Sequence, residues 1–232
     1  MPRISEERKI AEGRGTGSGP DYKPWIKIRE LNSRGTASNV IDWKHGRQLE
    51  LLSQGEVWWY YMLRWNDDVI DIREQYPLAL DATRSICKSL GFRHPGNGHM
   101  TTDFLVDYRD GTRKAFSIKD DPSALSDPRT VEKQYVEMEY WKTAGIPFYI
   151  VYKSDLDRTT IHNIMDVISC YSRDSVFDEF SQIRHMIAHK IISVNMSKRI
   201  DYPALIRQYK EELQRGWTDN SDRGLAVPDH KL

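Results

Sequence analysis

The sequence predicts an α/β protein: a mixed sheet flanked by helices, followed by a small, mainly helical C-terminal module. Two strand-like runs joined by a tight turn lie between His99 and Asp121. A helix and a strand precede this pair, and another helix and strand follow it. From Asp155 onward the periodicity is helical only. This order indicates a sheet assembled in the first two thirds of the chain.

Composition sets broad limits on function. The 232 residues contain 34 Lys plus Arg and 34 Asp plus Glu, so the chain has no excess of basic residues that would indicate a nucleic-acid partner. Cys87 and Cys170 are far apart and show no metal-ligand spacing, which fits a reducing compartment. The start of the chain has no apolar signal region, and no run is long enough to span a bilayer. We therefore expect a soluble, cytoplasmic, nucleoid-associated bacterial protein without a membrane partner.

The first residues read as an extended arm. Residues 1–50 carry 10 Lys or Arg against 7 Asp or Glu, with Gly13, Gly15, Gly17 and Gly19 interleaved. We expect residues 1–33 to form a flexible arm and the catalytic domain to occupy residues 34–154. A solvated tail is the favoured reading of the arm, and contact with a phosphate backbone is the alternative.

A buried helix follows at Ser53. The run VWWYYMLRW has little polar face, and Ser53 with Glu56 three residues later forms a capping box. Spacing alone therefore favours a structural role for Glu56. The aromatic residues of this run are better explained as core than as a base-stacking surface.

Next come a strand and a β-hairpin. Val69 to Tyr76 alternates apolar and polar residues before Pro77, which suits a strand with one buried face. Asp110-Gly111 is a hairpin turn signal between two apolar runs. Asp103 opens the first of these strands and Lys119 closes the second, so antiparallel pairing brings both to the end far from the turn.

An aspartate and a lysine at neighbouring strand ends allow two readings. A surface ion pair would contribute little to stability. In a phosphodiester hydrolysis site, a carboxylate would bind a hard divalent cation and the lysine would orient water or stabilise developing charge. The hairpin alone leaves both readings open.

The rest of the chain adds a helix, a strand and the C-terminal module. Val131, Tyr135, Met138 and Trp141 follow helical spacing after Thr130, which predicts the buried face of an amphipathic helix. The run from Ile146 to Tyr152 is almost wholly apolar, as in a central strand. Residues 155–217 are expected to form a helical docking or DNA-binding module, and residues 218–232 a disordered tail.

Several stretches together resemble the TnsA family, the endonuclease subunits of heteromeric cut-and-paste transposases. In order, the chain carries Glu56 on the first helix, VIDIREQYPL from Val69, MTTDFLVD from Met100, SIK from Ser117 and RTVEK from Arg129. The resemblance runs from about Arg34 to Tyr152. It implies a restriction-endonuclease-like fold.

The resemblance also implies a site. Glu56 and Asp103 would bind Mg²⁺, for which Mn²⁺ is expected to substitute, the carbonyl of Ile118 would add a third oxygen, and Lys119 would be the catalytic lysine. The chain departs from the family at Ser117, where the motif has Gln or Glu. Asp120 or Asp121 are candidates to compensate.

The implied function is Mg²⁺-dependent cleavage of the 5′ strands at transposon ends. The implied partners are transposon-end and flanking donor DNA, a DDE-type transposase that cuts the 3′ strands, and an AAA+ ATPase regulator. Because of Ser117, a catalytically impaired DNA-binding subunit of the same complex is the alternative. A free-standing restriction or repair nuclease of the same fold is a third reading.

Overall fold

The computed structural model describes residues 4–30 and 37–216. Its centre is the predicted hairpin, formed by β4 (Thr101–Tyr108) and β5 (Arg113–Lys119). At the turn Gly111 adopts a φ of 81°, and the Asp110 carboxylate accepts hydrogen bonds from the backbone and hydroxyl of Thr112. Phe104 pairs with Phe116, which fixes the register that places Asp103 opposite Ser117.

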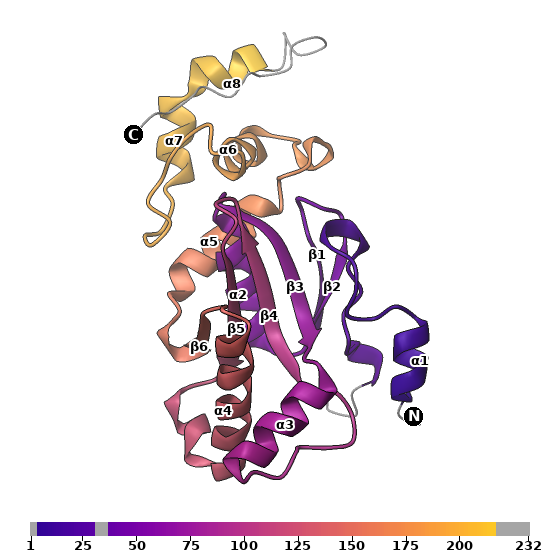
Figure 1. Ribbon diagram of the computed structural model, residues 1–232. Coiled ribbons are helices and arrows are strands. Elements are labelled where there is room, and N and C mark those ends of the chain that lie inside the picture. The colour runs from indigo at the N-terminus through magenta and orange to yellow at the C-terminus, as the bar shows by residue number, and fades with distance from the viewer. Residues whose placement is uncertain (1–3, 31–36, 217–232) are drawn as a thin grey trace. The chain divides into compact units, whose positions relative to one another are not determined.

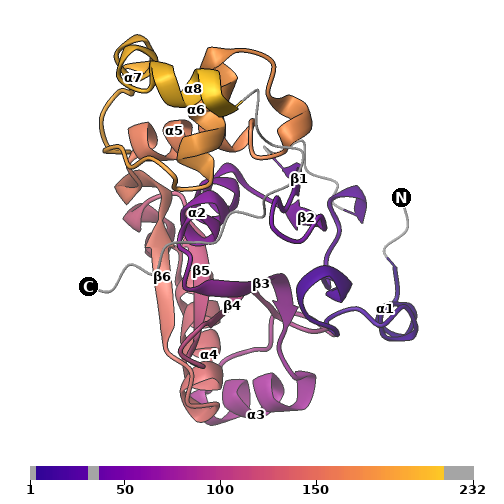
Figure 2. The ribbon, with the colours of Figure 1, turned by 90° about the horizontal axis from the view of Figure 1, so that it is seen from above.

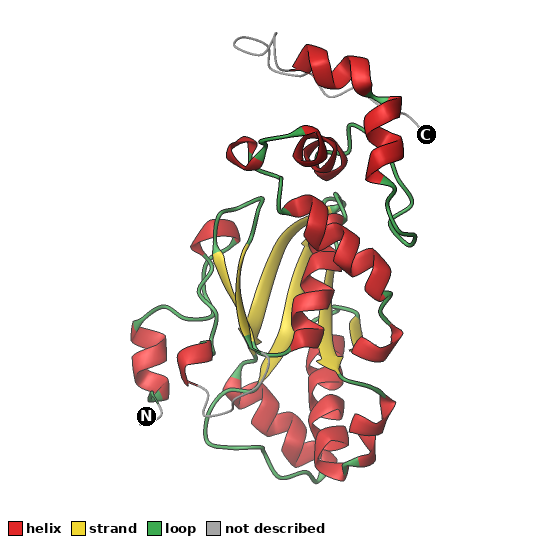
Figure 3. Cartoon of the chain, turned by 180° about the vertical axis from the view of Figure 1, so that it is seen from behind, coloured by secondary structure: helices red, strands yellow, loops and turns green. Residues whose placement is uncertain are grey.

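The main sheet has four strands in the order β3-β4-β5-β6, with β3 at Val69–Pro77 and β6 at Phe148–Tyr152. β6 runs parallel to β5, and the other neighbours are antiparallel. α2 (Gln54–Trp65) covers one face, whereas α3 (Leu80–Leu90) and α4 (Pro128–Thr143) cover the other (Figures 1 and 3). The predicted mixed sheet flanked by helices is confirmed.

Alternation along the hairpin builds a separate core on each face. Phe104, Val106 and Phe116 pack with the aromatic and aliphatic residues of α2. Leu105 and Ala115 point to the other side and pack with residues of α3 and α4, among them Trp141. Because successive strand residues face opposite sides, one hairpin contributes to both layers.

The buried face of α4 differs from the prediction. Gln134, Val136, Glu137 and Trp141 are buried, whereas Tyr135 and Met138 are 49% and 38% exposed. The helix begins after Asp127, whose carboxylate accepts backbone hydrogen bonds from Arg129 and Thr130. Two polar residues, Gln134 and Glu137, lie on the buried side. The spacing of apolar residues alone therefore predicted the wrong buried face for this helix.

The N-terminal segment also differs from the flexible arm predicted for residues 1–33. Residues 4–30 contain α1 (Glu6–Ala11) and two single turns, η1 (Gly19–Asp21) and η2 (Ile28–Glu30). The segment lies along the β3 edge (Figure 2). Tyr22 and Trp25 are each 3% exposed; Tyr22 donates its hydroxyl to the carbonyl of Glu74, and Trp25 its backbone N–H to that of Gln75. Burial of two aromatic side chains outweighs the glycine-rich composition.

A small hairpin precedes α2. It pairs β1 (Ser38–Ile41) with β2 (Gln48–Leu51), and its loop places Arg47 against Glu74 of β3. Both guanidinium NH groups of Arg47 donate 2.7 Å hydrogen bonds to the two carboxylate oxygens of Glu74. This bidentate pair ties the hairpin to the sheet strand that carries Gln75.

The chain divides into two compact units, residues 1–161 and 162–232. The division falls inside α5 (Arg158–Ile168) and not at residue 154, because Ile161 belongs to the α2-side core. The first unit also contains two short turns, η3 (Pro122–Ser126) and η4 (Lys153–Asp155). The second unit contains η5 (Arg173–Ser175), α6 (Glu179–Ala188), α7 (Tyr202–Gln208) and α8 (Lys210–Gly216). The tail predicted for residues 218–232 lies outside the described residues. No described helix is long and apolar enough to cross a membrane.

Candidate active site

Glu56 lies in the first turn of α2, next to the N-cap residue Ser53. The hydroxyl of Ser53 accepts from the backbone N–H of Glu56 at 3.2 Å and donates to its Oε1 at 2.9 Å. The backbone N–H of Leu52 donates to Oε2 at 2.9 Å. The predicted Ser53 cap is therefore present, the return hydrogen bond to the Glu56 side chain comes from Leu52, and Glu56 is buried.

Asp103 approaches the same region from β4. Its Oδ2 accepts a 2.6 Å hydrogen bond from the backbone N–H of Ile118 and a 3.4 Å bond from the Ser117 hydroxyl. These contacts follow from the hairpin register, which sets Asp103 against Ser117. The hairpin thereby fixes the orientation of the aspartate.

Lys119 closes β5 with its ammonium turned back toward the same strand. Its Nζ donates to the Ser117 hydroxyl at 2.7 Å and to the Ile118 carbonyl at 3.1 Å. Burial raises the pKa of Asp103, and the positive charge of Lys119 opposes that rise, so the two groups interact electrostatically. Ser117 bridges them because its hydroxyl bonds to both side chains.

Gln75 is a site residue that sequence reasoning missed. Its Nε2 donates to Glu56 Oε2 at 3.1 Å, and its Oε1 accepts from the Thr101 hydroxyl at 3.3 Å. The residue is buried and adopts a φ of 48°. Gln75 was visible in the sequence only as one letter of the VIDIREQYPL stretch, which gave no sign of its inward position.

Glu137 is a second missed residue, and it comes from α4. Its Oε2 accepts from the Thr102 hydroxyl at 3.0 Å, and its Oε1 accepts from Gln134 Nε2 at 3.1 Å. The Trp141 indole donates to the same Thr102 oxygen at 2.8 Å. The available signal was a glutamate one turn before Trp141 on a helix that packs on the sheet.

Three carboxyl groups in this region hold their protons more tightly than usual. Burial raises the pKa of Glu137 to about 8, and the nearby charge of Asp103 adds to the effect. Burial and the charge of Asp103 also raise the pKa of Glu56. Burial raises the pKa of Asp103 as well, against the opposing effects of Lys119 and the Ile118 hydrogen bond. Burial therefore favours the neutral form of these carboxyl groups, and a bound cation would favour their charged form.

The donor set fits a hard divalent cation. Mg²⁺ binds oxygen ligands and typically takes one or two carboxylates, with water and substrate phosphate completing its coordination. Glu56, Asp103 and the Ile118 carbonyl provide such oxygens. Among the described residues, no group of three or more His, Cys, Asp or Glu side chains that could hold a metal ion is present.

The structure brings some of the predicted site residues together and leaves others apart. Glu56 and Asp103 interact electrostatically, and Lys119 lies next to Asp103 along the hairpin. Asp120 instead pairs with Lys153 at 2.5 Å, and Asp121 accepts the backbone N–H of Ser123 at 2.7 Å. Both are therefore engaged elsewhere, so the expected compensation for Ser117 has no support from their contacts.

Comparison with known proteins identifies relatives of this chain. A family model described as "TnsA-like endonuclease N terminal" matches residues 66–153, a range that includes Asp103, Lys119, Gln75 and Glu137 and starts after Glu56. The transposon Tn7 transposition protein TnsA of Escherichia coli is 35% identical over 204 residues, which cover 84% of this chain and 75% of that protein.

Proposed function

Because the chain belongs to the TnsA family of transposase endonuclease subunits, we propose that it hydrolyses the 5′ strands at transposon ends with the help of Mg²⁺. The observation that carries this proposal is the joint placement of Glu56, Asp103 and Lys119 in a restriction-endonuclease-like fold. Glu56, Asp103 and the Ile118 carbonyl would hold the cation.

The chemistry can be assigned to individual groups. A bound divalent cation would polarise the scissile phosphate and lower the pKa of the attacking water. Asp103 keeps its position through the Ile118 N–H, and Glu56 through Leu52, Ser53 and Gln75. The Lys119 ammonium places a positive charge where negative charge develops on the phosphate oxygens, and Ser117 holds that ammonium.

Strand cleavage tests the proposal. The substrate is transposon-end DNA with Mg²⁺, and the proteins are this chain, a DDE-type transposase for the 3′ strands and an AAA+ ATPase regulator. Wild type is expected to leave 5′-phosphate and 3′-hydroxyl ends on the 5′-strand side. Lys119→Ala should leave only 3′-strand nicks, whereas Lys142→Ala, an exposed lysine of α4, should cut like wild type.

A result without 5′-strand cleavage would favour the alternative function. If wild type assembles with its partners on DNA but never cuts, the chain is a DNA-binding assembly subunit, and the serine at position 117 is the first residue to examine. Ser117→Gln restores the family's motif residue and should then restore cutting. Cleavage by wild type excludes this alternative.

We also propose that the C-terminal unit docks the AAA+ ATPase. A truncation after Ile168 tests this proposal. It leaves Ile161 in place, and Ile161 is part of the hydrophobic core on the α2 face of the sheet. The truncated chain is expected to keep its fold and lose ATPase capture. Capture at the wild-type level would assign docking to the first unit.

A further inference from the structure

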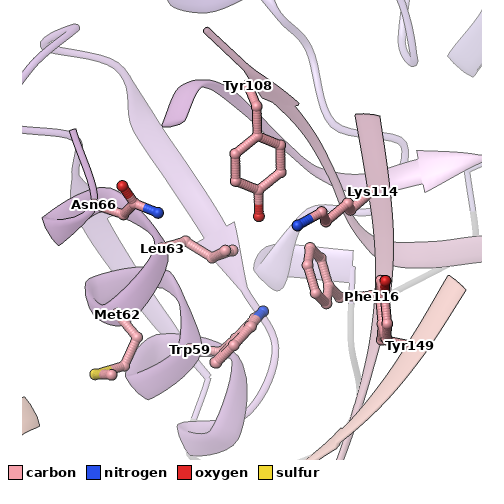
Figure 4. A pocket seen from close by; sticks show the side chains of 8 residues that line it. All are labelled: Trp59, Met62, Leu63, Asn66, Tyr108, Lys114, Phe116 and Tyr149. Carbon is pink, nitrogen blue, oxygen red and sulfur yellow. The ribbon is translucent and has the colours of Figure 1, made fainter. Parts of the chain in front are cut away.

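A pocket of about 400 Å³ opens on the α2 face of the sheet, apart from the candidate active site. It lies between α2 and strands β4, β5 and β6 (Figure 4). Its lining is Trp59, Met62, Leu63, Asn66, Tyr108, Lys114, Phe116 and Tyr149. On β5, Lys114 and Phe116 face this pocket, whereas Ser117 bonds to Asp103. The pocket and the carboxylates are therefore two distinct features of one domain.

Several polar side chains of the pocket offer hydrogen-bond donors. The indole N–H of Trp59 is buried and has no hydrogen-bond partner in the described part of the chain. The Asn66 oxygen accepts from the backbone of Asp68 at 2.9 Å, which leaves its amide N–H groups for a ligand. Figure 4 shows Trp59, Lys114 and Tyr108 with their polar atoms turned toward the same space. A ligand that carries acceptor oxygens would satisfy these groups.

The charge of the pocket is positive. The Lys114 ammonium lies 4.6 Å from the centre of the Tyr108 ring, and it interacts electrostatically with Asp110, which is not among the lining residues. No acidic residue lines the pocket. The lining therefore favours a ligand with negative charge next to its acceptor groups.

The walls of the pocket suit a flat ring. Tyr149 is 45% exposed and stacks on Phe116, with ring centroids 5.6 Å apart and an interplanar angle of 24°. Trp59 meets Phe116 edge-on at 5.3 Å. An exposed aromatic face next to a lysine is the arrangement on which single-stranded nucleic-acid bases stack.

We propose that this pocket binds one unstacked nucleotide of a DNA strand. The base stacks on Tyr149 and turns its acceptor atoms to Trp59 and Asn66, and a phosphate pairs with Lys114. The choice of DNA over other anionic ligands rests on the proposed endonuclease function. The proposal adds a strand-holding site separate from the groups that would perform hydrolysis.

Binding of two matched oligonucleotides tests it. A short single strand of thymidines is compared with an abasic strand of equal length, without divalent cation, by fluorescence anisotropy of the full chain. The two strands carry the same phosphates, so any preference for thymidine measures base contacts. Wild type is expected to bind the thymidine strand roughly tenfold more tightly.

Variants then assign the preference to the pocket. Tyr149→Ala and Trp59→Phe should abolish this preference. Lys114→Met should weaken the binding of both strands and reduce the slope of log affinity against log salt concentration by about 0.7. Tyr135→Ala and Lys88→Met, on α4 and α3 at the other face, are the exposed controls. Asp103→Asn should keep the preference, so a failure of cleavage is distinguishable from a failure of the pocket.

Two results would overturn the proposal. Equal wild-type affinity for the two strands would show that no base is held, and an unchanged preference in Tyr149→Ala would place the base elsewhere. In either case a side chain of a protein partner becomes the better occupant. Thermal melting of each variant checks that the fold is intact.

Discussion

Gln75 donates its side-chain amide to Glu56 Oε2 at 3.1 Å from a left-handed backbone conformation with a φ of 48°. Residues other than glycine seldom adopt this conformation, and it persists where several contacts impose it. The backbone N–H of Trp25 and the hydroxyl of Thr101 supply two such contacts. The N-terminal segment and β4 therefore hold the residue that orients Glu56.

Replacing Gln75 should impair the site without unfolding the protein. Gln75→Gly removes the amide and relieves the backbone, so stability should stay level or rise while cleavage falls. We expect the Mg²⁺ concentration for half-maximal cleavage to rise about tenfold, as for other groups that orient metal ligands. Titration of Mg²⁺ in the cleavage assay measures this, with exposed Gln48→Gly as the control. An unchanged Mg²⁺ requirement would contradict the positioning role.

The buried carboxyl of Glu137 should make metal-free stability fall as pH rises. Its pKa is raised to about 8 from a usual 4.5, so the folded state binds the proton that the unfolded state releases. The free energy of unfolding should therefore decrease between about pH 4.5 and pH 8. In Glu137→Gln this decrease should be smaller. Urea unfolding across that range measures the slope, with Glu139→Gln on the same helix for comparison; equal slopes in wild type and Glu137→Gln would contradict the prediction.

Divalent cations should stabilise the fold more at high pH than at low pH. The pKa values of Glu56 and Asp103 are both raised, and the carboxyls must lose their protons before they bind a cation. We expect the melting temperature to rise on addition of Mg²⁺ at about pH 8 and to change little at about pH 5. A chelator should reverse the shift. Asp103→Asn should remove it, and a full shift in that variant would rule out Asp103 as a ligand.

The sequence was informative where local signals decide structure. The Asp110-Gly111 turn fixes the hairpin register, which places Asp103 beside the β5 residues that lead to Lys119. The N-cap at Ser53 places Glu56 in the first turn of α2. The positions of these residues were therefore predictable, although the joint role proposed for them came only from the family resemblance.

The remaining site residues depend on tertiary contacts that no local pattern encodes. Glu137 is buried and accepts hydrogen bonds from Thr102 and Gln134. The face of α4 that carries Glu137 therefore packs on the sheet, and Tyr135 and Met138, which we expected to be buried, are exposed. The inward position of Gln75 requires a backbone conformation that its residue type does not announce.

The N-terminal segment offers the clearest test of a tertiary contact that overrides composition. Trp25 is 3% exposed, its ring centroid lies 4.5 Å from that of His99, and its carbonyl accepts from Arg14 at 3.1 Å. Trp25→Ala should lower the free energy of unfolding by about 3–5 kcal/mol, as for other buried tryptophans. Ile10→Ala, at a residue of the same segment that is 61% exposed, should change it little. Urea unfolding measures these free energies. If Trp25→Ala is as stable as wild type, residues 4–30 behave as the solvated arm that their glycine content suggested. If it is destabilised, the segment that fixes Gln75 is part of the folded domain.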